Sequence, residues 1–310
     1  VYEIDPIRDP RWPSFLRTHP EASIFHSPAW LQTLQQTYAY EPIAYTTSGP
    51  GETLRDGIAC CRISSHLTGR RLVSLPFSDH CQPLLSDASV LPVLLQQLKD
   101  TCAQGPWKYL ELRPWGDMCQ TLPTPFSVAQ LAYLHRLNLN PECSKLFAGF
   151  HKSCMRRRIR HASRVGLTYE SGRSEGVLGK FYQLQLQMRR KHQLPPQPLA
   201  WFRNLLENLR DQCTIHVASH GGTPVASIVT LRYQHTVIYK YGASDPSRYH
   251  LGGMIALLWR AIQDAKANGA SVFDMVRSDR EQPGLVRFKD RWGVSIIVFW
   301  IVNPIFRARF

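Results

Sequence analysis

The chain has 310 residues, of which 44% are hydrophobic and 11% are aromatic. This apolar content is ordinary for a folded protein and excludes an intrinsically disordered chain, which would carry far fewer apolar residues. The length suggests about two domains. Lysine and arginine total 37 against 23 acidic residues, and the net charge of +14 favours an anionic partner such as a phosphorylated substrate, a nucleotide, RNA or an acidic membrane surface.

Cysteine usage and hydropathy narrow the class further. The eight cysteines are scattered without a C-x-x-C pair, which is typical of reduced thiols and gives no zinc-ligand spacing, so we expect no metal site. No stretch reaches the roughly 20 apolar residues of a membrane-spanning helix, and residues 1–17 show no secretory leader. We therefore expect a cytoplasmic protein, and the basic surface makes the inner face of the membrane a candidate place of peripheral contact.

The first half of the chain alternates helical and strand patterns. A helix is expected over Pro28–Tyr38, with Ser27 as its N-cap and proline at its first position. Leucines at helical spacing predict a second helix over Val90–Cys102. We infer an α/β domain with mixed sheets over residues 1–140. The expected strands are Ile43–Thr46, Gly57–Ile63, Arg71–Leu75, Trp107–Leu112 and Ala132–Leu137.

The second half, residues 141–310, repeats this order of elements. Gly221-Gly222 and Gln234-His235 predict turns between three strands, and Gly269 lies where the C-terminal cap of a long helix belongs. The expected helices are Phe150–Val165, Val177–Met188, Trp201–Leu209, Leu251–Asn268 and Leu285–Arg291. The expected strands are Leu167–Ser171, Thr214–Ser219, Val225–Tyr233, Thr236–Gly242, Ser271–Met275 and Val294–Val302.

The strongest basic feature is the run from His151 to Arg164. On one continuous helix, Lys152, Arg156, Arg160 and Arg164 lie four residues apart and form a single stripe. Like charges side by side repel one another, so we expect an anion near them. Two interpretations stay open: a phosphate or RNA site, which suits the bidentate geometry of arginine, and a solvated helix face.

Two further segments are candidates for a site. Tyr241–Asp245 leads from a strand to a helix, and such loops present backbone N–H groups that can hold a phosphate or carboxylate. The alternative for this segment is a plain turn before a core helix. Near the end of the chain, a strand end at Phe273–Ser278 is followed by a glycine-bearing segment, Gly284–Gly293, which predicts a site wall. The candidates for substrate contact in these segments are Tyr241, Arg277, Ser278, Arg287 and Phe288.

Taken together, these motifs resemble the FemAB-type branch of the GNAT superfamily of acyltransferases. The resemblance covers residues 25–302 and rests on the order and spacing of short motifs. It implies two GNAT-like domains in tandem, of which the second is better preserved. The matching segments are Phe25–Trp30, His151–Ala162, Arg190–Pro195, Pro224–Ser227, Tyr241–Asp245, Phe273–Ser278 and Phe288–Gly293.

The best-known members of this family transfer amino acids from aminoacyl-tRNA to a peptidoglycan precursor. The resemblance therefore implies transfer of an acyl or aminoacyl group to an amine of an anionic, small or lipid-linked envelope precursor related to peptidoglycan or exopolysaccharide. It implies no permanently bound cofactor, because the donor is a co-substrate: aminoacyl-tRNA, acyl-CoA or another acyl carrier. It also implies that Lys289 lies at the reaction centre and that Lys152 and Arg156 bind phosphates, with tRNA as a candidate partner.

Three departures from the resembling proteins are visible. The family often has glycine where this chain has Val276, and the long helical arm of some tRNA-dependent members is absent. The coenzyme A loop of GNAT enzymes, Q/R-x-x-G-x-G/A, does not fit Arg248-Tyr-His-Leu-Gly252-Gly253. The spacing therefore counts against coenzyme A as the donor.

For the chemistry, we expect the substrate amine to attack an ester or thioester carbonyl directly, because no G-x-S-x-G nucleophile motif appears. Lys289 is expected to stabilise the oxyanion. Asp245, Asp274 and His250 stay open as candidates for the group that accepts the proton of the amine. Two rival functions also stay open: a coenzyme A-dependent N-acetyltransferase of a sugar or peptide amine, and a non-catalytic RNA-binding or scaffold protein.

Overall fold

The computed structural model describes residues 1–65, 69–116 and 126–304, which divide by their contacts into two units. Unit 1 contains residues 1–133 together with those from 297 onward, and unit 2 contains residues 134–296. The sequence analysis places a single boundary at residues 140 and 141. The division differs because β7 (Phe126–Asn138) and β13 (Ser295–Pro304) are unbroken strands that contain the ends of unit 2, so no polar linker marks them.

Unit 1 is a mixed sheet with helices packed against it. Its strand order is β1-β2-β3-β4-β6, with β5 beside β3; β4 and β6 run parallel and the other pairs antiparallel. The side-chain hydroxyl of Ser27 accepts a hydrogen bond from the Trp30 N–H, which confirms the predicted N-cap. The elements are β1 (Tyr2–Ile4), α1 (Arg11–Thr18), α2 (Pro28–Tyr38), β2 (Glu41–Thr46), β3 (Asp56–Ser65), β4 (Gly69–Val73), β5 (Leu84–Leu85), α3 (Leu91–Gln104) and β6 (Trp107–Glu111).

The core of unit 1 forms where α3 meets the sheet. Leu94 and Leu98, one helical turn apart, pack with Ile58 of the neighbouring strand. A second contact comes from the far end of the chain, because Trp115 and the buried Phe299 form an isolated antiparallel bridge. Unit 1 is therefore built from both ends of the chain.

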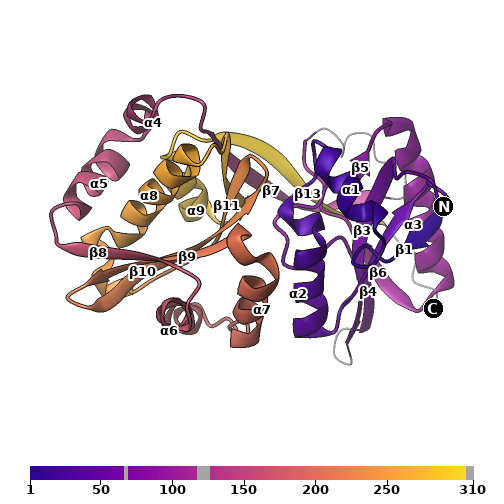
Figure 1. The fold of residues 1–310 in the computed structure, drawn as a ribbon, viewed down its shortest axis with the longest axis horizontal. Helices are drawn as coiled ribbons and strands as arrows, with labels where there is room; N and C mark the ends of the chain where they lie inside the picture. Colours follow the sequence, from indigo (N-terminus) through magenta and orange to yellow (C-terminus); the bar gives the residue numbers. More distant parts are fainter. Residues whose placement is uncertain (66–68, 117–125, 305–310) are drawn as a thin grey trace. The chain divides into compact units, whose positions relative to one another are not determined.

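Unit 2 is a second mixed sheet, with strand order β13-β7-β12-β11-β10-β9-β8. The pair β11 and β12 is parallel, and β8 to β11 form an antiparallel run. Helices α6 and α7 cover one face and α8 covers the other, as Figure 1 shows. The elements are α4 (Cys143–Gly149), α5 (Arg157–Ala162), β8 (Leu167–Gly172), α6 (Glu175–Lys191), α7 (Leu199–Leu209), β9 (Cys213–His220), β10 (Thr223–Tyr233), β11 (Thr236–Ser244), α8 (Gly253–Ala267), β12 (Val272–Asp279) and α9 (Pro283–Asp290).

The predicted turns of unit 2 lie where the sequence indicates. Gly221 and Gly222 both have positive φ between β9 and β10, and Gln234 has φ +49° between β10 and β11. Gly269, with φ +78°, follows the C-cap residue Asn268 of α8 and adopts the left-handed conformation that favours glycine. The predicted α/β class with two mixed sheets is confirmed.

The predicted helix Phe150–Val165 is helical over Lys152–Ala162, but its first turn is π-helical and both of its ends are shorter than predicted. The helix α4 ends at Gly149, and a π-helical turn over Lys152–Arg156 then precedes the short α5. His151 is the N-cap of this turn: its ring nitrogen accepts from the Cys154 N–H, and its own N–H donates to the Arg291 carbonyl at 2.9 Å. Arg164 lies in a turn beyond α5, so the four basic residues do not form the expected stripe on one helix.

Candidate functional site

One extra residue in β11 controls which side chains face each side of the unit 2 sheet. Tyr239 pairs with Thr230 but Tyr241 pairs with Val229, so Lys240 is a bulge. The Tyr239 hydroxyl consequently reaches Met254 of α8, whereas the Tyr241 hydroxyl accepts a hydrogen bond at 2.9 Å from the indole N–H of Trp201, on α7. The predicted substrate residue Tyr241 thus points to the face that α7 covers.

Beyond the bulge, a pocket of about 410 Å³ opens between the end of β11 and the start of α8. β11 and β12 pair from Thr236 to Ile238, and both strands continue beyond that ladder. A side chain at Gly253 would lie 3.1 Å from Val225, so glycine lets α8 begin close to the sheet. We call this the α8 pocket; its walls include Gly242 and Ser244 of β11, Gly252–Ile255, Arg158, Arg248, Tyr249, Leu285 and Phe288.

The electrostatics of the α8 pocket suit an anion. The N–H groups of Gly253, Met254 and Ile255 are the first of α8 and precede the helix's own hydrogen bonds, the earliest of which joins the Ala256 N–H to the Gly252 carbonyl. The N-cap Gly252 has no side chain that could accept from them. The helix dipole adds positive potential at the same point.

Two arginines reinforce this potential. Arg158 and Arg248 both line the α8 pocket; the Arg158 guanidinium donates to the Tyr249 carbonyl at 3.2 Å, and the Arg248 guanidinium lies 3.8 Å from the Asp245 carboxylate. Sequence reasoning chose Lys152 and Arg156 instead and missed Arg158, although it belongs to the same basic run. The π-helical turn changes the helical phase, and nothing in the local pattern signals that change.

The remaining residues of the predicted stripe do not line the α8 pocket. Lys152 is exposed, and Arg156 is partly buried on the π-helical turn. The Arg160 guanidinium lies 5.5 Å from the centre of the Phe147 ring, a cation–π distance.

A second group of charged residues surrounds a strained point in β12. Val276 has φ +56°, a left-handed conformation that is costly for a β-branched residue. The buried Asp274 accepts the Val276 N–H at 2.7 Å. Lys289 is only 2% exposed, and its ammonium donates to the carbonyls of Val276 at 3.1 Å and Arg277 at 2.8 Å. We call Asp274, Val276 and Lys289 the β12 clamp.

The β12 clamp lies where β12 leaves β11, because Ile238 with Asp274 is the last pair of that ladder. The family glycine that Val276 replaces therefore corresponds to a position that needs positive φ. His135 is completely buried, and its ring lies 3.4 Å from Asp290. Burial lowers the pKa of His135 to about 4, and the positive charge of Lys289 acts in the same direction.

The structure separates the other predicted residues. The Asp245 carboxylate accepts hydrogen bonds from both the N–H and the hydroxyl of Ser247. Asp245 is thereby the N-cap of the short helical turn before α8. Ser278 is buried, and its hydroxyl has no hydrogen-bond partner among the residues that the structure describes. Arg277 and Ser278 lie on β12 and follow the clamp directly. Of the predicted residues on α9 and on the short helical turn η6 (Pro246–Leu251), Phe288 lines the α8 pocket, whereas Arg287 and His250 are exposed.

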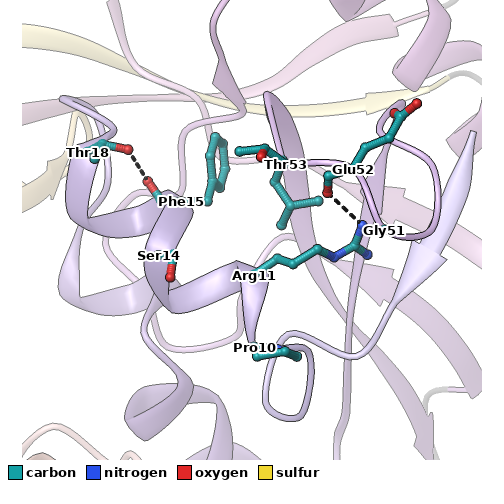
Figure 2. Close-up of a pocket in the computed structure, with 9 residues that line it drawn as sticks. Pro10, Arg11, Ser14, Phe15, Thr18, Gly51, Glu52 and Thr53 are labelled. Carbon is teal, nitrogen blue, oxygen red and sulfur yellow. Dashed lines mark hydrogen bonds between the residues drawn. The ribbon is translucent and has the colours of Figure 1, made fainter.

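Unit 1 also has a hollow, of about 420 Å³, beside α1 (Figure 2). Its one guanidinium, of Arg11, is bound to the Asp9 carboxylate and to the carbonyls of Gly49 and Glu52. Those donors therefore hold the loop of unit 1 in place. The α8 pocket is the better candidate site, because its N–H groups and arginines converge on one space.

Within residues 1–65, 69–116 and 126–304, no group of three histidine, cysteine, aspartate or glutamate side chains is placed to hold a metal ion. The described cysteines are free thiols; Cys119 lies outside the described residues. In the same ranges no helix is both long enough and apolar enough to cross a bilayer.

Comparison with known proteins identifies the class of unit 2. Residues 150–290 match the family model described as an acetyltransferase (GNAT) domain, and this stretch contains the whole α8 pocket and the β12 clamp. No curated protein sequence is significantly similar to this chain. Residues 150–290 therefore match a GNAT acetyltransferase domain, a domain whose class of reaction is acyl transfer.

The fold is shared with solved structures over nearly the whole chain. FemX is 13% identical, with a TM-score of 0.73 over 99% of this chain and 98% of FemX. The C-terminal domain of a putative lysylphosphatidylglycerol synthetase from Agrobacterium fabrum is 12% identical, with a TM-score of 0.61 over 97% of this chain and 92% of that chain. A tandem GNAT protein from the clavulanic acid biosynthesis pathway is 9% identical, with a TM-score of 0.58 over 94% and 93%. The resemblance expected from the sequence motifs is confirmed: the fold is the tandem GNAT fold, as in FemX.

Proposed function

We propose that this chain transfers an acyl or aminoacyl group to the amine of a cell-envelope precursor, and that the α8 pocket receives the acyl donor. One observation carries this proposal. The α8 pocket brings the free N–H groups at the start of α8 together with Arg158 and Arg248, inside the matched GNAT domain. Such a site suits the phosphate or carboxylate of a donor or substrate.

In the proposed reaction, the amine nitrogen attacks the donor carbonyl and forms a new C–N bond. The ester or thioester bond breaks, and the departing alcohol or thiol takes up a proton. The amine must lose a proton, and we assign Asp245 to accept it. Its carboxylate is partly exposed, with a side chain 23% accessible, and it lies between Ser244 and Arg248, which both line the α8 pocket.

Lys289 and Asp274 have a different role in this proposal. Both side chains are buried and bind the backbone of the β12 clamp, so we assign them to hold β12 away from β11. They are positioning residues, because they act on the strand and do not themselves meet the acyl carbonyl. In this proposal, the β12 clamp maintains the backbone conformation of β12 beside the pocket.

The choice of an envelope precursor as acceptor is supported by two kinds of likeness. The sequence motifs resemble those of the bridge-forming FemAB-type proteins. The fold is that of FemX and of an enzyme named for making lysylphosphatidylglycerol. A lipid-linked or phosphorylated acceptor also agrees with the net charge of +14.

A second function, coenzyme A-dependent N-acetylation of a sugar or peptide amine, is favoured by the same α8 pocket. The N–H groups of α8 would suit a pyrophosphate, even though the loop spacing Arg248–Gly253 departs from the GNAT pattern. The two functions differ in the carrier of the acyl group. Ligand binding separates them directly.

The test is a thermal-shift measurement with acetyl-CoA, coenzyme A, an aminoacyl-tRNA analogue and a UDP-linked muramyl peptide. A ligand that binds the folded state raises the melting temperature through mass action. Stabilisation by the tRNA analogue or muramyl peptide supports the envelope proposal, and stabilisation by acetyl-CoA alone moves the chain to the second function. Arg158→Gln should remove the effect of the donor, whereas Arg157→Gln, an exposed neighbour outside the pocket wall, should not. Salt-sensitive RNA binding that Arg158→Gln leaves unchanged, with no stabilisation by the other ligands, would refute both.

A further inference from the structure

Large apolar side chains are exposed at the mouth of the α8 pocket. Tyr249 and Leu285 both line the pocket, yet they remain 46% and 39% exposed. They come from different elements, the turn before α8 and the start of α9. Leu194, which is 51% exposed, lies just beyond the end of α6, with its N–H bound to the Arg189 carbonyl. A single exposed apolar residue is unremarkable, but two at one opening call for a partner, and Leu194 follows three residues after Lys191, which contacts the ring of Tyr249.

Positive charge is interleaved with these side chains. The Lys191 ammonium lies 5.3 Å from the centre of the Tyr249 ring, and Arg158 donates to the carbonyl of the same tyrosine. Arg248 precedes Tyr249 and also lines the pocket. The last turn of α6 is basic as well, with Arg189 and Arg190 beside Lys191.

This combination fits a membrane better than a nucleic acid. Basic side chains satisfy the phosphates of either partner. Aliphatic groups such as Leu194 and Leu285 gain free energy when they enter the boundary between headgroups and acyl chains, but they offer nothing to a sugar-phosphate backbone. Tyrosine is enriched at the same boundary, where its ring is buried and its hydroxyl stays hydrated.

We propose that this surface docks unit 2 on an anionic phospholipid membrane, with the mouth of the α8 pocket toward the headgroups. The docking patch consists of Arg158, Lys191, Leu194, Arg248, Tyr249 and Leu285. This proposal rests on the proposed function for its biological role: the acceptor would be a lipid-linked molecule that reaches the α8 pocket from the bilayer. The physical claim of docking concerns the full-length chain alone and needs no substrate.

The test is co-sedimentation of the full-length chain with vesicles of phosphatidylcholine, with or without phosphatidylglycerol, at low and physiological salt. We expect binding to the anionic vesicles that weakens as salt increases. The decisive variant is Lys191→Gln with Leu194→Ser, since neither residue lines the pocket. We expect it to lower the partition coefficient about tenfold, roughly fivefold from the lost charge and the remainder from the lost apolar side chain.

A matched control removes the same kinds of group elsewhere. Lys108→Gln with Val93→Ser changes one exposed lysine and one aliphatic side chain, 54% exposed, in unit 1. This pair should bind vesicles like the unchanged protein. Equal binding to neutral and anionic vesicles, or equal loss in both double variants, would overturn the proposal. Binding of the same patch to tRNA but not to vesicles would overturn it too and would make the patch a nucleic-acid surface.

The two proposals fail separately. Lys191→Gln with Leu194→Ser should leave donor stabilisation in the thermal-shift assay unchanged. Vesicle binding without stabilisation by any donor would refute the proposed function and retain the docking patch. Donor stabilisation without binding to anionic vesicles would refute the docking patch and retain the proposed function.

Discussion

Replacement of Lys289 by methionine tests the β12 clamp most directly. The change keeps the length of the side chain and removes the two hydrogen bonds from its ammonium to the carbonyls of Val276 and Arg277. A hydrogen bond from a charged donor contributes about 1.5–3 kcal/mol, so the two lost bonds cost about 3–6 kcal/mol. Methionine recovers part of this, because a buried ammonium is costly to desolvate. We expect the free energy of unfolding to fall by about 2 kcal/mol, within the range of disrupted buried networks.

The measurement is urea unfolding of the full-length chain followed by circular dichroism, with Lys152→Met as the control at an exposed position. The control should unfold within about 0.5 kcal/mol of the unchanged protein. A Lys289→Met protein as stable as the control, or more stable, would show that desolvation of the ammonium outweighs its hydrogen bonds. The clamp would then contribute nothing to the shape of β12.

Three further predictions follow from the geometry. Val276→Gly should raise the free energy of unfolding by about 1 kcal/mol, because glycine adopts φ +56° without strain. A free energy of unfolding below that of the unchanged protein, measured in urea, would contradict the backbone strain assigned to Val276. Gly253→Val should abolish donor stabilisation in the thermal-shift assay, since its side chain would meet Val225 at the start of α8; retained stabilisation would place the donor elsewhere. Burial lowers the pKa of His26 and of His135 to about 4, below the ordinary 6.5. Each neutral histidine therefore contributes stability that is fully present above pH 6.5 and is lost as the pH falls towards 4, by roughly 3 kcal/mol at most. A melting temperature that stays constant between pH 6.5 and pH 4 would disprove this pH dependence.

Local chemistry made much of the fold predictable from the sequence. Ser27 caps α2 through its own hydroxyl, and the paired glycines at 221 and 222 supply the positive φ that the turn requires. These signals lie within a few residues of the structure they specify. The motif order predicted the tandem GNAT fold for the same reason, because it records the sequence of such local elements.

The features that shape the candidate site depend on contacts between distant segments. The break at His151 requires the Arg291 carbonyl, and the left-handed Val276 requires Lys289. The bulge at Lys240 reverses the faces of β11, so Tyr241 points to Trp201 and not to the side of α8. A pattern of residue types along one segment carries no information about these partners, which is why Arg158 was missed.

The bridge between Trp115 and Phe299 has a consequence for the order in which the chain is completed on the ribosome. Residues 134–294 emerge before β13, so unit 2 can form its sheet from β7 to β8 while the edge strand β13 is still missing. Unit 1 emerges first, but its Trp115 has no Phe299 to pair with until β13 has left the exit tunnel. Both sheets therefore wait for the same strand, and the usual rule that the N-terminal domain folds first does not hold for this final step.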